Sequence, residues 1–141
     1  MIAALLAQSK ALEFRTSVED IEHSISKGLA AAHETYRRAK RGEFLYAQTL
    51  LDELRQHIMK ADDLLFGRTP YTAVYAKFDE RGSPEVIEAL AASFCGYDGP
   101  AIESALGRVV RFYRRQVVAL HEKFPLVRPL ESDLAALDVI S

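Results

Sequence analysis

The sequence predicts an all-α fold, an up-down helical bundle of about four main helices followed by a short terminal helix. Apolar residues recur at steps of three and four along most of the chain, which is the spacing of one helix face. Caps, glycines and prolines divide this pattern into segments, and the alternation of a strand is nowhere sustained. The chain has 141 residues, 49% of them apolar, enough for one domain with its own core. We expect the bundle over residues 16–128, an N-terminal extension over 1–15 and a short helix or tail over 129–141.

The first long helix is predicted to begin at Thr16 and Ser17, because these residues precede Glu19 and Asp20 at the spacing of a capping box. The apolar stripe that follows consists of Val18, Ile21, Ile25, Ala32, Tyr36 and Ala39, with one turn missed at Gly28. A basic run and then Gly42 close the helix, since cations suit a helix C-terminus and glycine suits the left-handed residue after it.

The second long helix is predicted to begin near Glu43 and to end at Gly67. Its apolar residues alternate steps of three and four, the spacing of a packing seam in a bundle. They are Phe44, Ala47, Leu51, Leu54, Ile58, Ala61 and Leu65. Residues 68–82 have no sustained period and contain three aromatic residues, so we predict a long loop there, and such loops inside compact domains are often functional.

Two further helix starts can be identified from their capping residues. The Ser-Pro-Glu sequence at 83–85 combines a cap, a proline at the first position and an acid in the first turn, and the helix it begins is expected to carry Phe94 on its apolar face and to stop at Gly96. Asp-Gly-Pro at 98–100 begins the last long helix, which Pro125 ends. A short terminal helix is expected over 130–140.

Composition and charge argue for a domain in a reducing compartment, and we expect the cytoplasm. The chain has 18 basic and 20 acidic residues, so it has no general attraction to nucleic acid or to an acidic membrane. The single cysteine, Cys95, excludes an internal disulfide and a cysteine-based zinc site. No apolar run is long enough to cross a bilayer, and residues 1–14 lack the basic start and cleavage pattern of a signal peptide.

The common catalytic motifs are missing from the sequence. It contains no phosphate-binding loop, no dinucleotide fingerprint, no nucleophile elbow and no H-E-x-x-H pair. Asp20-x-x-His23 is the only approach to the Glu-x-x-His pattern of bundle metal sites, and it stands alone. We therefore expect no metal and no cofactor, and a chain that is not catalytic by itself.

The polar side of the second helix is our first candidate binding site. Asp52, Glu53 and Arg55 lie on it, and Tyr71 or Tyr75 from the following loop would lie beside them around a small polar ligand. The alternative is a solvated helix face with local ion pairs, and loop aromatics that fill the core.

The last long helix carries a second candidate. Arg115 and His121 fit the R-x(4–6)-H spacing, in which a cation and an imidazole cleave an RNA phosphodiester in a dimer cleft. The alternative is an exposed cationic face, because such a match arises easily in an arginine-rich helix. Val110 and Val118 lie outside the main apolar stripe of this helix, which indicates a homodimer seam.

Three segments resemble the C-terminal helical domain of antibiotic (kanamycin-type) nucleotidyltransferases. Residues 41–55 (RGEFLYAQTLLDELR) resemble its second bundle helix, residues 78–90 its short helix after the loop, and residues 101–124 its closing helix. The resemblance covers about residues 16–128 and implies the helical half of the enzyme, which binds the acceptor substrate.

This chain departs from those enzymes at the metal site. Their Gly-Ser turn is followed by an Asp-x-Asp pair, whereas here Gly82 and Ser83 are followed by Pro84 and Glu85. The resemblance thus implies a non-catalytic substrate-binding or partner-binding domain, with a separate nucleotidyltransferase subunit as a possible partner. Nucleic acid is not the expected ligand, although related bundles include the R-x(4–6)-H ribonuclease toxins. A purely structural, self-associating bundle is the third hypothesis.

Overall fold

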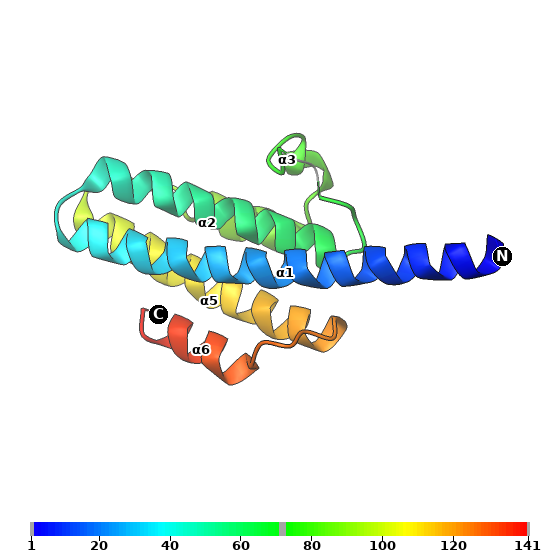
Figure 1. Cartoon of the computed structure of the whole chain (residues 1–141). Helices are drawn as coiled ribbons and strands as arrows, with labels where there is room; N and C mark the ends of the chain where they lie inside the picture. The colour runs from blue at the N-terminus through cyan, green and yellow to red at the C-terminus, as the bar shows by residue number, and fades with distance from the viewer. Residues whose placement is uncertain (1, 71–72, 141) are drawn as a thin grey trace.

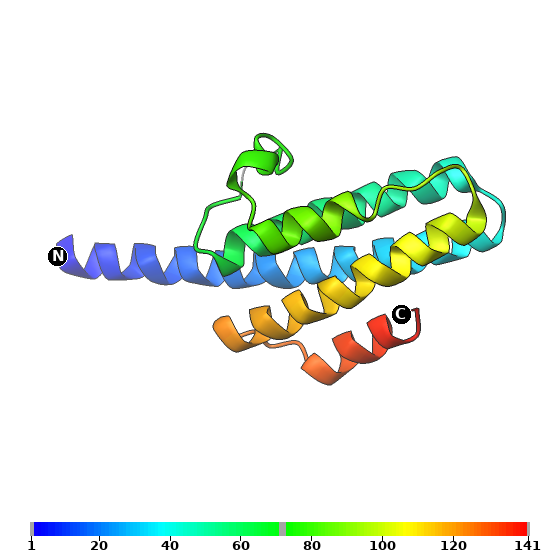
Figure 2. The same ribbon diagram turned by 180° about the vertical axis from the view of Figure 1, so that it is seen from behind.

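The computed structural model describes residues 2–70 and 73–140, and in the first helix it describes side chains from Val18 onward. Six helices and no strand occupy these ranges, so the all-α prediction is confirmed. They are α1 (Ile2–Lys40), α2 (Phe44–Leu65), α3 (Phe78–Arg81), α4 (Pro84–Ala91), α5 (Gly99–Lys123) and α6 (Leu130–Asp138). The helices α1, α2 and α5 run side by side along the bundle, α6 lies along α1 and α5, and α4 packs between α2 and α5 (Figure 1, Figure 2).

The first helix starts earlier than its capping-box pattern predicts. It begins at Ile2, so the predicted start at Thr16 and Ser17 was wrong. The residues before Thr16 are mostly good helix formers without glycine or proline, and the helix therefore continues through the capping residues. Its N-terminal part extends beyond the ends of the other helices (Figure 1, Figure 2). None of the helices described is both long and apolar enough to cross a membrane.

The missed turn at Gly28 marks a close helix crossing. Gly28 is buried against the ring of Tyr113 on α5, and a Cβ at this position would lie 2.8 Å from Tyr113 Cζ. Tyr113 is fully buried, and this burial raises the pKa of its phenol above the usual value. The apolar stripes of α1, α2 and α5 meet around this crossing and form the main core.

The predicted starts of α4 and α5 are confirmed. Ser83 Oγ accepts a hydrogen bond from the Val86 amide at 3.4 Å, and an Asp98 carboxylate oxygen accepts one from the Ala101 amide at 3.0 Å. The predicted end of the α4 helix at Gly96 was wrong, because α4 stops at Ala91. Phe94 consequently lies outside the helix with 67% of its surface exposed.

Ion pairs and hydrogen bonds hold the chain after α2 against the C-terminal end of that helix. We call this cluster the loop clamp; it consists of Asp62, Asp63, Arg68, Arg81 and Ser83. Asp63 accepts hydrogen bonds from Arg68 Nε at 2.9 Å and from Arg81 Nη2 at 2.9 Å. Asp62 pairs with Arg68 and accepts from Ser83 Oγ at 2.7 Å and from the Ser83 amide at 3.0 Å. Both carboxylates are buried, and their partners satisfy them.

Candidate anion-binding groove

A groove of about 560 Å³ opens between α4 and α5. From the α4 side it is lined by Glu85, Glu88, Ala89 and Ala92, and from the α5 side by Arg108, Arg111, Phe112 and Arg115. We call it the arginine groove. Three cations and two carboxylates line it together with the apolar side chains of Ala89, Ala92 and Phe112.

The arginines reach one side of the groove because of their spacing. Arg108, Arg111 and Arg115 are three and four residues apart, so they share one face of α5. Arg108 donates from Nη1 to Ser104 Oγ at 2.9 Å and from Nη2 to the Ala92 carbonyl at 3.0 Å. It therefore ties α5 to the end of α4 and fixes one end of the groove.

Among the described residues, the other two arginines have no acidic partner. Within residues 73–140, neither Arg111 nor Arg115 forms an ion pair, and the Arg115 guanidinium lies 5.1 Å from the ring centroid of Phe112. The side chains of Glu85 and Glu88 are exposed and make no hydrogen bond to the described part of the chain. Both walls of the groove thus present charges that the fold itself does not use.

These charges are suited to bind an oxyanion. A guanidinium is planar, always charged, and can donate two parallel hydrogen bonds to a phosphate or carboxylate. The Arg115 guanidinium lies over the ring of Phe112, a cation–π contact that favours this position. The nearby glutamates would oppose a long polyanion, so the groove favours a small ligand.

The structure places Arg55, a predicted ligand contact, in a structural role. It is 3% exposed, donates from Nε to Ser93 Oγ at 2.7 Å and from Nη2 to the Ser93 carbonyl at 3.0 Å, and lies 4.0 Å from the ring centroid of Phe94. Its remaining nitrogen, Nη1, donates to Asp52 at 3.3 Å. Asp52 and Arg55 are therefore brought together, but the guanidinium is occupied by the segment after α4.

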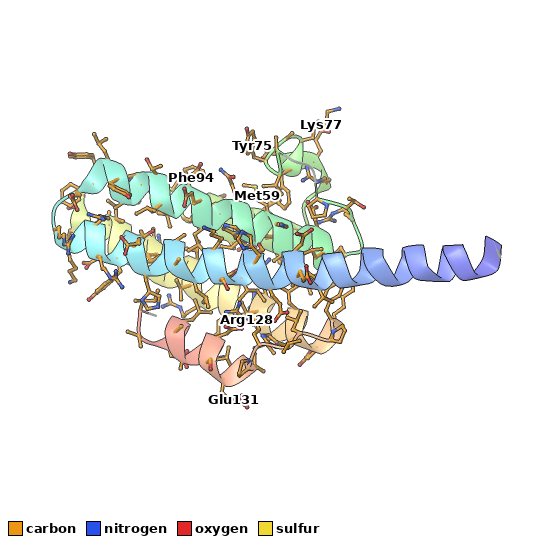
Figure 3. The ribbon with its side chains drawn as sticks, viewed as in Figure 1. Met59, Tyr75, Lys77, Phe94, Arg128 and Glu131 are labelled. Atoms are coloured by element: carbon orange, nitrogen blue, oxygen red, sulfur yellow. The ribbon has the colours of Figure 1, made fainter. Side chains whose placement is uncertain are left out.

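The remaining members of that predicted site are dispersed. Glu53 is exposed on α2, and Tyr75 is 60% exposed on the loop before α3, beyond the α2 ribbon (Figure 3). Tyr71 lies outside the described residues. The structure does not bring Glu53 or Tyr75 into the arginine groove.

Arg115 and His121 face different parts of the molecule. They are six residues apart, about a third of a turn in azimuth. Arg115 lines the groove, whereas His121 Nε2 is bonded to Asp133 Oδ2 at 2.9 Å, beneath α6. Asp133 is 1% exposed and also accepts from Arg128, so it fixes the imidazole at the contact between α5 and α6. This geometry does not place the two side chains in one cleft.

The groove residues on α4 were not among the sequence candidates. The arginines of α5 are visible in the sequence, but Glu85 and Glu88 look like ordinary exposed residues of a short helix. The available signal is their spacing of three, which puts both on one face of α4. Which helix that face meets depends on tertiary packing, which the spacing does not reveal.

The histidine on α2 is neutral near pH 7. His57 Nδ1 lies 2.9 Å from Ser24 Oγ, and burial lowers the pKa of this imidazole to about 4, with further lowering by Lys60, His23 and Lys27. In the part of the chain whose side chains are described, no three His, Cys, Asp or Glu residues gather in a way that could hold a metal ion.

The fold and the groove together define a class: a helical bundle with a mixed-charge, arginine-lined surface groove. A comparison with protein-family models and with curated protein sequences finds no match to this chain.

Proposed function

We propose that this chain is a non-catalytic binding domain whose arginine groove binds the anionic group of a small polar ligand. The observation that carries the proposal is the pair Arg111 and Arg115, which line the groove without an acidic partner among the described residues. In the loop clamp, by contrast, Arg68 and Arg81 are both paired with the buried carboxylate of Asp63.

The resemblance to the nucleotidyltransferase helical domain supports the same class of function. In that arrangement the helical half binds the substrate, and a separate nucleotidyltransferase subunit would supply the metal-binding carboxylates. The proposed role of this chain is thus to capture a ligand for a partner. The proposed ligand site is the groove between α4 and α5, whereas the sequence analysis predicted the polar face of α2.

The proposal is tested by titrating the protein with inorganic phosphate and pyrophosphate in a calorimeter at low salt. We expect wild type to bind pyrophosphate and the Arg111→Ala/Arg115→Ala variant to bind it about tenfold or more weakly, because charge-assisted hydrogen bonds are lost. The matched control is Lys27→Ala/Arg41→Ala, which removes the same charge from two exposed positions outside the groove that form no ion pair among the described residues. Equal losses in both variants, or no binding by wild type, would refute the proposal.

Self-association is a separate proposal with less structural support. Val110, on which the expected homodimer seam depends, is 0% exposed and packs in the core of a single chain, while Val118 is half-buried. Light scattering at several protein concentrations tests the homodimer, and a mass of one chain throughout would exclude it.

A further inference from the structure

The two walls of the arginine groove carry opposite charges. Arg111 and Arg115 stand on the α5 wall, and Glu85 and Glu88 stand on the α4 wall. Resting on the proposed function above, we propose that the ligand is a phosphate ester that also carries a primary amine. The phosphate binds to the arginine wall, and the ammonium group binds to the glutamate wall.

The two groove glutamates are the reason to propose an amine on the ligand. A simple phosphate in the groove is attracted by Arg111 and Arg115 but repelled by Glu85 and Glu88, which line the same space. An ammonium group on the ligand replaces that repulsion with attraction. Neither glutamate forms an ion pair within the described ranges, so the ligand does not have to displace an existing partner.

Two of the arginines contact groups other than those carboxylates. Arg108 is bonded to Ser104 and to the Ala92 carbonyl, and Arg115 lies against Phe112. Because both charged walls line the same groove, a ligand that spans it can contact both at once. A nucleic-acid backbone, which repeats its negative charge and offers no ammonium, does not match the glutamate wall.

The experiment compares ligands that differ only in the amine. Glucosamine 6-phosphate is paired with glucose 6-phosphate, and O-phosphoethanolamine with ethyl phosphate, in calorimetric titrations at pH 7 and low salt. We expect wild type to bind the amine-bearing member of at least one pair about fivefold more tightly, as two partly exposed ion pairs imply. In Glu85→Gln/Glu88→Gln that preference disappears, while the amine-free esters bind as tightly as before or more tightly.

Controls separate this effect from a general change in charge or stability. Glu80→Gln/Glu131→Gln removes the same charge from exposed positions outside the groove and should keep the preference (Figure 3 shows Glu131 on α6). Thermal unfolding of each variant confirms that it is folded. Because both groove glutamates are exposed, their replacement should leave the fold intact.

The same chemistry could come from a free ester or from a lipid headgroup. Vesicles of phosphatidylcholine with and without phosphatidylethanolamine form the second arm of the experiment. Retention on the phosphatidylethanolamine vesicles alone, lost in Glu85→Gln/Glu88→Gln, supports the headgroup as the source. Preference for the free amine-bearing esters, without vesicle retention, supports a soluble ligand.

Failure of this inference is distinguishable from failure of the proposed function. If wild type binds both members of each pair equally, and Arg111→Ala/Arg115→Ala abolishes binding, the groove is an anion site without amine selection and the inference is wrong. If neither the esters nor pyrophosphate bind, both proposals are wrong.

Discussion

The loop clamp and the arginine groove use the same kinds of residue for different ends. In the loop clamp, Asp63 is 0% exposed and is bonded to Arg68 and Arg81. In the arginine groove, Arg111 and Arg115 are near two glutamates but pair with neither. Residue type alone therefore does not distinguish a charge that holds the fold from one that is available to a ligand, whereas burial and pairing do.

The energetic difference between the two regions follows from solvent. A buried carboxylate that loses its partners remains desolvated, which costs about 3–5 kcal/mol. An exposed ion pair contributes about 0–1 kcal/mol, so loss of an exposed cation has little effect on folding. Substitutions in the clamp should thus change stability, and substitutions in the groove should change binding.

The largest effect is expected at the centre of the clamp. Arg68→Ala/Arg81→Ala leaves the buried Asp63 carboxylate without its two cation partners and should lower the free energy of unfolding by about 3 kcal/mol. Urea unfolding followed by circular dichroism measures this change. The control is Glu88→Ala in the groove, and a loss below about 1 kcal/mol in Arg68→Ala/Arg81→Ala would show that the clamp does not stabilise the fold.

The second-largest effect is expected at Arg55, and it tests whether this residue stabilises the fold or binds the ligand. Arg55→Ala removes the donors to Ser93 and the contact with Phe94, and should destabilise by about 2 kcal/mol because buried polar groups lose their partners. Thermal unfolding measures the loss, and Glu53→Ala on the exposed face of α2 is the control. If Arg55→Ala is as stable as wild type but binds the ligand more weakly, Arg55 is a ligand-binding residue.

Arg55 also shows where sequence reasoning stops. The capping residues Ser83 and Asp98 could be identified because they act on amides three residues away. The partner of Arg55, Ser93, is 38 residues away, and helical periodicity gives the face of a residue but not what packs on it. For the same reason the arginines of α5 were visible in the sequence, but the glutamates of α4 opposite them were not.

A smaller, pH-dependent effect is expected at His57, which lies among cations rather than acids. Its pKa is lowered to about 4 in the folded chain, against about 6.5 in the unfolded chain, so the unfolded state binds the proton first. Its contribution to stability is complete above pH 6.5 and is lost as the pH falls toward 4, by about 1–2 kcal/mol after discounting for solvent screening. The measurement is urea unfolding of wild type and His57→Asn from pH 7.5 to 4.

Carboxylates titrate in the same pH range, so the contribution of His57 is the difference between these two proteins. Asparagine keeps a polar group near Ser24 Oγ but does not titrate. Wild type should lose more stability than His57→Asn between pH 6.5 and 4. Parallel curves would mean that the imidazole titrates normally in the folded chain.

The smallest effect on stability is expected at Arg111 and Arg115, where the effect on ligand binding is expected to be greatest. Arg111→Ala/Arg115→Ala should change the free energy of unfolding by less than about 0.5 kcal/mol per site, because no ion pair within residues 73–140 is broken. Pyrophosphate should raise the unfolding temperature of wild type but not of this variant, since only a ligand that binds the native state stabilises it. A large loss of stability in the absence of ligand would mean that these arginines stabilise the fold, as the residues of the loop clamp do. The proposed difference between the two regions would then be wrong.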